Sequence, residues 1–483
     1  MADREPLSSI DTAWLRMDRP TNLMMICGMM MLDGRVDLQQ VRDVIRTRLL
    51  CFHRFRQRVV ESGGGAYWET DPDFDLDWHV RRIAIPVVVE GNGLEEVVSD
   101  LISTPLDASK PMWQFHLIDD ERGGSALVLR IHHCYGDGFA LTYVVASLTD
   151  IDPGKPLPPP EDVGVADRGE PHRSAWERML GLVTETVGDA VQSMLAVAET
   201  GREWLAQPGQ AIECGKTGVE LAYEAAFIAG MTPDSHTRFK GRLGVMKRVA
   251  WSEPLSLFEV KALAEALDCS VNDVLVACAS GALRSYLIEQ GDAVDGCEVR
   301  ALVPVNLRPP GPITELGNRF GLVFLSLPIG VAHPFERLYE VKRRMGVLKH
   351  SRQPLVALGI LAGMGLVPKM IKERVLETLA ANASAVITNV KGTSEPRYFA
   401  GARIARQIFW VPQSGGIGLG ISILSYDGKI DFGIVADVKR VPDPGLIVQR
   451  FRSEFEVLLL QSLLMPWPGD LPEIDVNSAV ALQ

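Results

Sequence analysis

The sequence lacks the signatures of a metal site, a disulfide-stabilised fold or a membrane span. Its seven cysteines are an odd number and none forms a CxxC pair, so neither a disulfide framework nor a zinc site is indicated. A reducing cytosol fits this cysteine usage best. The N-terminal segment carries charge throughout and has no apolar stretch of the kind found in signal peptides. We therefore expect a cytoplasmic location.

Long apolar runs are also missing, because no uncharged apolar stretch reaches the ~18–20 residues that a spanning helix needs. The nearest is Leu355–Val367, which lies between Pro354 and Pro368. One interpretation is a buried helix. The other is an apolar surface that touches lipid or an apolar substrate, since an interfacial helix is often anchored by basic residues. Such residues follow it, namely Lys369, Lys372 and Arg374.

An excess of positive charge is absent as well. The formal net charge of −12 argues against nucleic acid or anionic lipid as a bulk electrostatic partner, although a local basic patch or a hydrophobic membrane contact stays possible. Hydrophobic residues make up 47% and charged residues 23%, as is typical of globular proteins with substantial cores. The length of 483 residues predicts two or three domains.

What the chain does contain is two regions that mix helix and strand patterns. We predict an N-terminal domain over 1–165, a linker with connecting helices over 166–240, and a C-terminal domain over 241–483. The Pro-rich stretch 152–174 supports the linker, and Ser174 could cap an amphipathic helix that follows it. The predicted strands are Met24–Leu32, Ala126–Ile131, Val299–Val305, Gly321–Leu327, Ala385–Val390, Gly418–Ser425 and Lys429–Val435. The predicted helices are Leu38–Leu50, Leu141–Leu148, Ser256–Leu267 and Val271–Leu287.

The segment HHCYGDG, residues 132–138, is the most informative pattern, because it follows a predicted buried strand. A histidine with a near-neutral pKa can take a proton from a hydroxyl group and return it to a leaving group. Asp137 can fix the local backbone or pair with a cation, and Gly138 lets other atoms come close. A pair of histidines after a strand is nevertheless more often structural than catalytic.

Other chemistries fit the segment less well. A metal site needs a third ligand, and neither HExxH nor a cysteine cluster supplies one. A serine hydrolase would carry a nucleophile elbow such as GxSxG, which is absent. A covalent route through Cys134 is conceivable. Direct attack by an incoming alcohol, with a histidine as base, is the simpler mechanism.

Beyond these seven residues, the chain resembles the bacterial wax ester synthase/diacylglycerol acyltransferase family of CoA-dependent acyltransferases. HHCYGDG is similar to that family's HHxxxDG motif, and LSSIDTAWLRMDRP resembles its opening. In TNVKG, residues 388–392, Thr and Lys depart from the usual SNVPG. Further blocks agree in order from about residue 8 to 460: PLD at 105–107 with PMW at 111–113, NDVL at 272–275, VPVNLRP at 303–309, GNR at 317–319 and SYDG at 425–428.

The resemblance implies an α/β (α+β) fold of two chloramphenicol-acetyltransferase-like domains, joined by a helical linker, with the active site in a channel between them. It implies His133 as general base, and we expect His132 to support His133 through a hydrogen bond. We further expect Asp137 to be structural and to pair with Arg308, and Asn272 to stabilise the oxyanion, with the N-cap of its helix as the alternative role. Trp113, Met112 and Gly138 are expected along the substrate channel, with aromatic core packing as the default for Trp113.

The implied activity moves a long-chain fatty acyl group from acyl-CoA to a fatty alcohol or diacylglycerol. No permanently bound cofactor and no metal are expected, acyl-CoA is the co-substrate, and attachment to a membrane or lipid-droplet surface stays open. One rival is an HxxxD enzyme that uses another acceptor or a carrier-protein thioester. A rival of another class is a non-catalytic lipid-binding or lipid-droplet protein.

Overall fold

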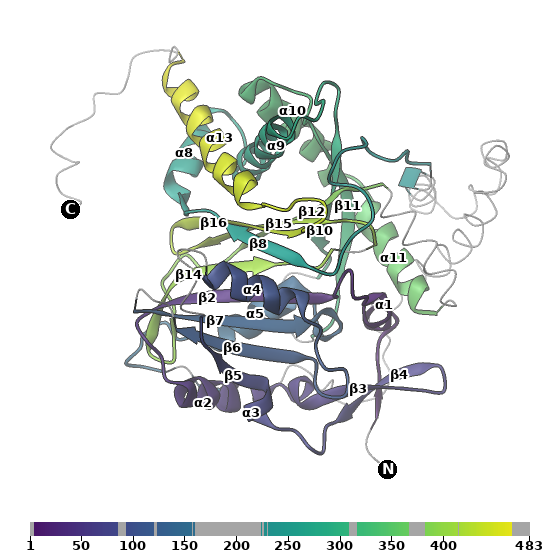
Figure 1. The fold of residues 1–483 in the computed structure, drawn as a ribbon, viewed down its shortest axis with the longest axis vertical. Coiled ribbons are helices and arrows are strands. Elements are labelled where there is room, and N and C mark those ends of the chain that lie inside the picture. The colour runs from purple at the N-terminus through teal and green to yellow at the C-terminus, as the bar shows by residue number, and fades with distance from the viewer. Residues whose placement is uncertain are drawn as a thin grey trace.

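The computed structural model describes residues 4–85, 93–119, 123–156, 158–159, 224, 227–228, 230–308, 316–366, 382–413 and 415–465. Within them the strands form three sheets, and the two larger sheets lie one above the other (Figure 1). The predicted linker 166–240 falls mostly outside the described residues, as do most of the Pro-rich stretch and the helix expected after Ser174.

The lower large sheet has six strands, in the spatial order β13-β14-β2-β7-β6-β5. They are β13 (Tyr398–Phe399), β14 (Ala402–Trp410), β2 (Met25–Asp33), β7 (Ser125–His132), β6 (Trp113–Asp119) and β5 (Val80–Ile83). Beside it lies a small sheet of β1 (Glu5–Pro6), β4 (Gly65–Thr70) and β3 (Gln57–Ser62). Every residue of β7 is buried, so the strand that leads to the histidine motif lies in the middle of the sheet.

The upper large sheet has seven strands, in the order β11-β10-β12-β15-β16-β8, with β9 also paired to β16. They are β11 (Phe320–Leu327), β10 (Val299–Asn306), β12 (Ala385–Lys391), β15 (Leu419–Tyr426), β16 (Lys429–Asp437), β8 (Lys247–Trp251) and β9 (Leu255–Ser256). The predicted hairpin turn between β15 and β16 is confirmed, because Asp427 and Gly428 both have positive φ.

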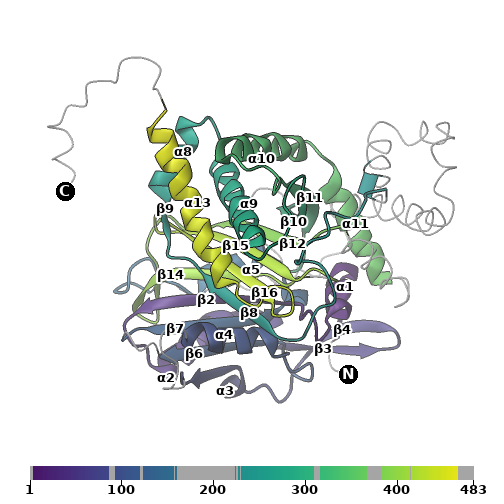
Figure 2. The same cartoon turned by 45° about the horizontal axis from the view of Figure 1, so that its top comes forward.

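The helices follow the two halves of the chain. The N-terminal half has α1 (Ser9–Met17), α2 (Leu38–Arg48), α3 (Leu76–His79), α4 (Gly93–Ser103) and α5 (Gly138–Ser147), with short 3₁₀ turns η1 (Leu49–Cys51), η2 (His53–Arg56) and η3 (His133–Tyr135). The C-terminal half has α8 (Leu257–Ala266), α9 (Val271–Glu289), α10 (Pro334–Lys349), α11 (Gln353–Leu366) and α13 (Gly445–Leu463). Figure 2 shows α9 and α13 covering one face of the upper sheet.

All seven predicted strands and all four predicted helices are present, with boundaries shifted by up to three residues. The shifts have local causes. Helix α5 begins at Gly138 rather than Leu141 because the side chain of Asp137 caps it. Helix α8 begins one residue after Ser256 because Ser256 is its N-cap.

The two halves of the chain are interleaved rather than simply consecutive. Strands β13 and β14, which come from the C-terminal half of the sequence, complete the lower sheet through antiparallel pairing of β14 with β2. In Figure 1, β14 lies next to β2, on the side of the lower sheet that faces the upper sheet. The predicted domains 1–165 and 241–483 stay a prediction. The lower sheet contains strands from both of these ranges.

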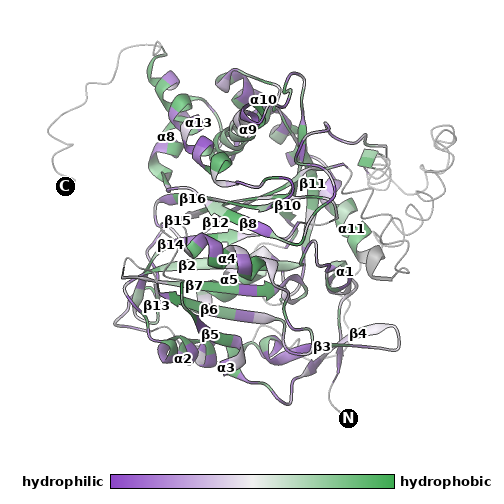
Figure 3. Ribbon diagram, in the orientation of Figure 1, coloured by the Kyte–Doolittle hydropathy of each residue, from purple (hydrophilic) through white to green (hydrophobic). Residues whose placement is uncertain are grey.

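The apolar helices of the C-terminal half are core elements in their described parts. Helix α9 is long and apolar enough to cross a bilayer, but 72% of its apolar window is buried inside the protein. In α11 the described side chains from Val356 to Leu361 are mostly buried, which favours the buried-helix interpretation of this segment. Val367 and the basic residues after it lie outside the described residues. Figure 3 shows the apolar colouring concentrated on the strands and on the helix faces that cover them.

Candidate active site

The histidine motif occupies the connection between β7 and α5. His132 is the last residue of β7, and His133–Tyr135 form the turn η3. Asp137 then caps α5, because its Oδ1 accepts a hydrogen bond from the backbone N–H of Ala140 at 2.9 Å. The motif is therefore held between a central strand and a capped helix, both of which are rigid supports.

The second carboxylate oxygen of Asp137 ties the motif to the C-terminal half. Oδ2 forms an ion pair with Arg308 and accepts the backbone N–H of Arg319 at 2.8 Å. Arg308 also donates to the carbonyl of Gly317 at 2.6 Å, and Gly317 forms a β-bridge with Gly136. The predicted pairing of Asp137 with Arg308 is confirmed, and the pair satisfies the requirement that a buried charge have close partners.

The backbone of His133 is fixed on both sides. Its N–H donates to the carbonyl of Met24 at 2.8 Å, and its carbonyl accepts from the side-chain amide of Asn318 at 2.8 Å. The same amide nitrogen donates to Asp11 at 2.7 Å, a buried carboxyl whose pKa is raised by burial. Asn318 thus joins α1, the histidine turn and the segment before β11.

The ring of His133 lies between two aromatic side chains. The indole of Trp14, in α1, stacks on the imidazole with ring centroids 4.1 Å apart and an interplanar angle of 9°. Phe320, at the start of β11, lies 5.7 Å away at a tilt of 35°. This packing sets the plane of the imidazole before any substrate arrives.

Burial determines the protonation state of His133, which is only 5% exposed. Desolvation lowers the pKa of His133 to about 4, and the negative charge of Asp137 only partly opposes this effect. The imidazole is therefore neutral at pH 7 and able to accept a proton.

His132 supports the turn in a different way from the one we expected. Its Nδ1 accepts the backbone N–H of Cys134 at 3.2 Å, and its Nε2 lies 4.0 Å from a carboxylate oxygen of Asp18. Burial, followed by the charge of His133, lowers its pKa to about 3. The expected hydrogen bond to His133 is wrong for the described structure, because the ring of His132 points its two nitrogens at these other groups.

Two apolar cavities adjoin the motif. The smaller, of about 80 Å³, is lined by His133, Trp14, Asp137, Phe320 and Thr388 among others, and so lies between the two halves of the chain. The larger, of about 260 Å³, lies between α5 and the strands β2 and β7. Both cavities share four lining residues: Ile26, Gly138, Val390 and Phe409. Gly138 thus lines both cavities, and its role along a substrate channel stays a prediction.

The walls of the smaller cavity include two residues with a buried polar atom that lacks a hydrogen-bond partner within the described part of the chain. These atoms are Nε1 of Trp14 and Oγ1 of Thr388. An unsatisfied buried polar atom costs about 1–3 kcal/mol. Each is therefore a candidate donor to a polar group of a ligand.

Asn272 does not join this cluster. It is exposed near the start of α9, where its side-chain oxygen accepts from the amide of Asn389 in β12. Alternate residues of a strand point to opposite faces, and Thr388 points into the His133 cavity, so Asn389 and Asn272 lie on the other face of the upper sheet. The alternative role as N-cap is also wrong, because Ser270 caps α9 through a capping box with Asp273.

Trp113 and Met112 are core residues and line neither cavity. Trp113 is fully buried, stacks on His79 with centroids 4.3 Å apart, and donates its indole N–H to the carbonyl of Phe55. The default reading of aromatic core packing is therefore confirmed. Cys134 also lines neither cavity, and burial raises its thiol pKa well above the usual value, which disfavours a thiolate nucleophile.

Comparison with known families agrees with this arrangement of two joined halves. The model of the wax ester synthase/diacylglycerol acyltransferase catalytic domain matches residues 7–275, and the model of the C-terminal domain of that family matches residues 316–459. The chain belongs to the wax ester synthase/diacylglycerol acyltransferase family. It is therefore an acyltransferase.

Relatives and solved structures extend the match over nearly the whole chain. A Mycobacterium tuberculosis protein named as a diacylglycerol O-acyltransferase is 29% identical and covers 94% of this chain and 90% of its own length. The wax ester synthase/diacylglycerol acyltransferase from Marinobacter aquaeolei matches at a TM-score of 0.70 and 22% identity, covering 95% and 100%. The first condensation domain of the CDA synthetase matches at 0.58 and 15% identity, covering 95% and 96%. The predicted two-domain acyltransferase fold is confirmed.

Three residues around His133 were not assigned a role from the sequence alone: Trp14 and Thr388, which line the smaller cavity, and Asn318, which donates to the carbonyl of His133. Each lies inside a block through which the chain resembles its family, namely the N-terminal opening, GNR and TNVKG. That position was the available signal. Their roles depend on contacts across more than 100 residues of sequence, which the motifs do not encode.

Proposed function

We propose that this acyltransferase moves a long-chain fatty acyl group from acyl-CoA to the hydroxyl of a fatty alcohol or diacylglycerol, with His133 as general base. The observation that carries the proposal is a buried, neutral histidine that opens on an apolar cavity between the two halves of the chain. Acyl-CoA arrives as a co-substrate, and the reaction needs no permanently bound cofactor.

The reaction follows from the position of that base. His133 takes the proton of the acceptor hydroxyl while the oxygen attacks the thioester carbonyl carbon. The tetrahedral intermediate collapses, the C–S bond breaks, and the CoA thiolate takes the proton back from the imidazolium. The products are an ester and CoA, and the histidine returns to its neutral form. General-base assistance of this kind contributes about 10²–10⁴ in rate.

The negative charge on the carbonyl oxygen needs donors in a site that excludes water. The hydroxyl of Thr388 and the indole N–H of Trp14 are buried, line the same cavity as His133 and have no partner among the described residues. We assign the oxyanion to these two groups in place of Asn272, which lies on the other face of the sheet. Trp14 has a second role, because its stacking also orients the base.

The apolar character of the walls supports a lipid substrate. The larger cavity is lined mainly by aliphatic side chains, among them Ile26, Leu129, Ile131, Leu141 and Val145. Burying a methylene group in such surroundings stabilises the complex by about 0.8 kcal/mol. The mycobacterial relatives carry diacylglycerol in their names, which supports diacylglycerol as one acceptor.

The proposal is tested by measuring release of free CoA from palmitoyl-CoA by the full-length chain. Hexadecanol and dioleoylglycerol are offered separately as acceptors, and palmitoyl-carrier protein replaces palmitoyl-CoA in a parallel series. We expect acceptor-dependent release with palmitoyl-CoA. Turnover with the carrier protein alone would instead support a condensation-type enzyme, and lipid binding without turnover would support a non-catalytic protein.

The same assay tests the oxyanion assignment. Thr388→Val removes one donor from the cavity without changing the shape of the side chain, and we expect kcat to fall by about 10²–10³. Thr47→Val is the matched control, because that hydroxyl donates to the carbonyl of Asp43 on the exposed face of α2. Equal activities of the two variants would contradict the role of Thr388.

A further inference from the structure

Among the residues of α5, Gly138 alone borders both cavities. It is the first residue of α5 and lines the His133 cavity as well as the larger cavity under β2 and β7. A Cβ atom built at this position would meet no other atom within 4 Å. Its φ is not in the left-handed region, so the backbone itself does not require glycine. The absent side chain is therefore what keeps the space open.

The other shared residues surround this opening from separate elements. Ile26 belongs to β2, Val390 to β12 and Phe409 to β14, so both halves of the chain contribute to the junction. All three are apolar and two are bulky. A linear apolar chain passing from one cavity to the other has to run between them and the bare backbone at Gly138.

We propose that Gly138 is the residue that selects for long acyl chains, because its missing side chain leaves the passage from His133 into the larger cavity. This inference rests on the proposed function. The thioester carbonyl lies beside His133, the first carbons of the acyl group fill the smaller cavity, and the rest of the chain crosses at Gly138 into the larger one.

The acyl donor fits this passage better than the acceptor does. The family name covers two acceptors, an alcohol with a single chain and diacylglycerol with two, whereas the donor in both reactions carries one linear acyl chain. A passage bordered by one glycine and three apolar side chains suits a single chain. We therefore assign the larger cavity to the acyl group.

The volumes of the two cavities indicate which acyl chains have to pass Gly138. A water-sized group takes about 30 Å³, so the 80 Å³ cavity holds about three such groups and the 260 Å³ cavity about nine. A butyryl group can remain beside His133. A palmitoyl group cannot: its sixteen carbons exceed even the about twelve groups that both cavities hold together, so its chain has to pass Gly138 and fill the larger cavity.

The test measures kcat/KM for butyryl-CoA and palmitoyl-CoA, at a fixed concentration of one acceptor, in the wild type and in Gly138→Ala, Gly138→Val and Gly138→Leu. Each methylene that no longer enters an apolar site lowers kcat/KM about fourfold. We expect the palmitoyl-to-butyryl ratio to fall by at least about 50-fold in Gly138→Val and Gly138→Leu, and by less in Gly138→Ala. A uniform loss on both substrates would overturn the proposal.

Two further variants separate the explanations. Gly346→Val places the same side chain on α10, where a Cβ also meets nothing within 4 Å and no described cavity is lined, and the ratio should stay at the wild-type value. Val390→Phe narrows the junction from the opposite wall, so it should reproduce the falling ratio even if a Gly138 variant does not fold. An unchanged ratio in Val390→Phe would also overturn the proposal.

The outcomes distinguish this inference from the proposed function. If the wild type transfers no acyl group from either CoA ester, the proposed function fails. If the wild type transfers palmitoyl groups and the Gly138 and Val390 variants keep its chain-length preference, only the inference about the passage fails. Varying the acceptor chain at constant palmitoyl-CoA checks the assignment to the donor, because the Gly138 variants should then show no dependence on acceptor length beyond that of the wild type.

Discussion

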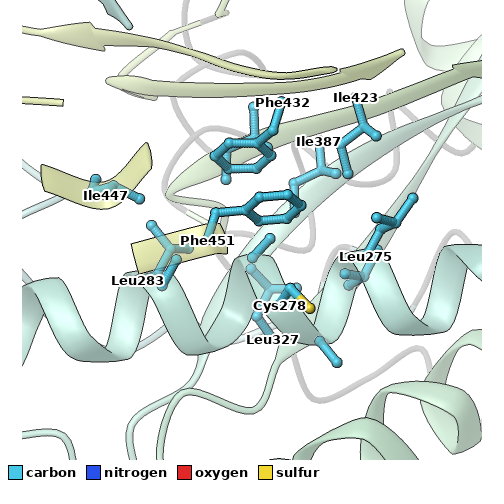
Figure 4. Close-up of a cluster of buried hydrophobic side chains, with 14 of the residues drawn as sticks. Leu275, Cys278, Leu283, Leu327, Ile387, Ile423, Phe432, Ile447 and Phe451 are labelled. Carbon is cyan, nitrogen blue, oxygen red and sulfur yellow. The ribbon is translucent and has the colours of Figure 1, made fainter. Parts of the chain in front are cut away.

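The two halves of the molecule place an apolar helix against a β-sheet in different ways. In the N-terminal half, α5 faces β2 and β7 across a cavity of about 260 Å³, and residues of β12, β14 and β15 from the C-terminal half complete its lining. In the C-terminal half, α9 and α13 pack directly on the upper sheet, and Phe451 of α13 stacks on Phe432 of β16 with ring centroids 3.8 Å apart (Figure 4). All three helices carry small or aliphatic residues, and the larger of the two described cavities lies at the first interface.

This difference indicates a division of labour. The close-packed interface provides stability, since protein cores approach the density of organic crystals and lose stability when atoms are removed. The hollow interface gives up dispersion contacts and keeps room for a ligand. The His133 turn lies at the end of the hollow interface, where Asp137 fastens it to the C-terminal half through Arg308.

Acidification should affect the two halves unequally, and this is the largest effect we expect. The buried histidines with lowered pKa values belong to the N-terminal half, whereas the described histidines of the C-terminal half are exposed. Burial, as the main cause, lowers the pKa to about 4 for His79 and His133 and to about 3 for His116 and His132.

The sign follows from proton uptake. An unfolded histidine has a pKa of about 6.5, so below that pH the unfolded chain binds protons that the native protein does not bind until about pH 4. The contribution of these four histidines to the free energy of unfolding should therefore be constant above about pH 7 and fall between about 6.5 and 4, by up to about 5 kcal/mol per pH unit. Urea denaturation at several pH values measures this slope.

A matched pair of variants checks the assignment. His116→Gln should reduce the slope by about one proton, or about 1.4 kcal/mol per pH unit, because it removes a buried titrating group. His350→Gln, at an exposed position, should leave the slope as in the wild type. Equal slopes in the two variants would show that burial of the histidines does not govern the acid sensitivity.

The same substitution in the two interfaces should have opposite effects of smaller size. Ala279→Leu inserts three carbons into the filled core of α9 and should destabilise the protein by about 1–3 kcal/mol through overpacking. Ala146→Leu directs the same group into the larger cavity and should leave stability unchanged or raise it by about 0.5–2 kcal/mol. Chemical denaturation compares the two, and equal destabilisation would mean that the cavity does not exist in solution.

The sequence indicates the fold well because its signals are local. Periodic apolar residues locate the helices, and short apolar runs that end at turn residues locate the strands. The caps Ser256 and Ser270, found in the structure, then fix where α8 and α9 begin. These patterns did not predict strand β14. Its residues are half-buried between two sheets, and it pairs with β2 across more than 370 residues of sequence, so no local pattern marks it.

The candidate site was predictable in part for a related reason. His133, Asp137 and Gly138 lie in one motif, and the pairing of Asp137 with Arg308, which we predicted as a link between the motif and the C-terminal half, is present. Trp14 and Thr388 reach the same cavity from distant segments, and Asn272 faces away because of strand alternation at Thr388 and Asn389. The packing of the two sheets determines which face of a strand borders the cavity. Local sequence patterns do not encode this packing.

We propose that His133 performs the chemistry while Asp137 holds the two halves together. The decisive measurement records CoA release from palmitoyl-CoA and the thermal unfolding transition for His133→Ala and Asp137→Ala side by side. We predict that His133→Ala keeps a cooperative transition but loses at least about 100-fold in turnover. Asp137→Ala should lose about 3–5 kcal/mol of stability, because Arg308 is left buried without its partner carboxylate. Wild-type turnover in a folded His133→Ala variant would contradict the claim.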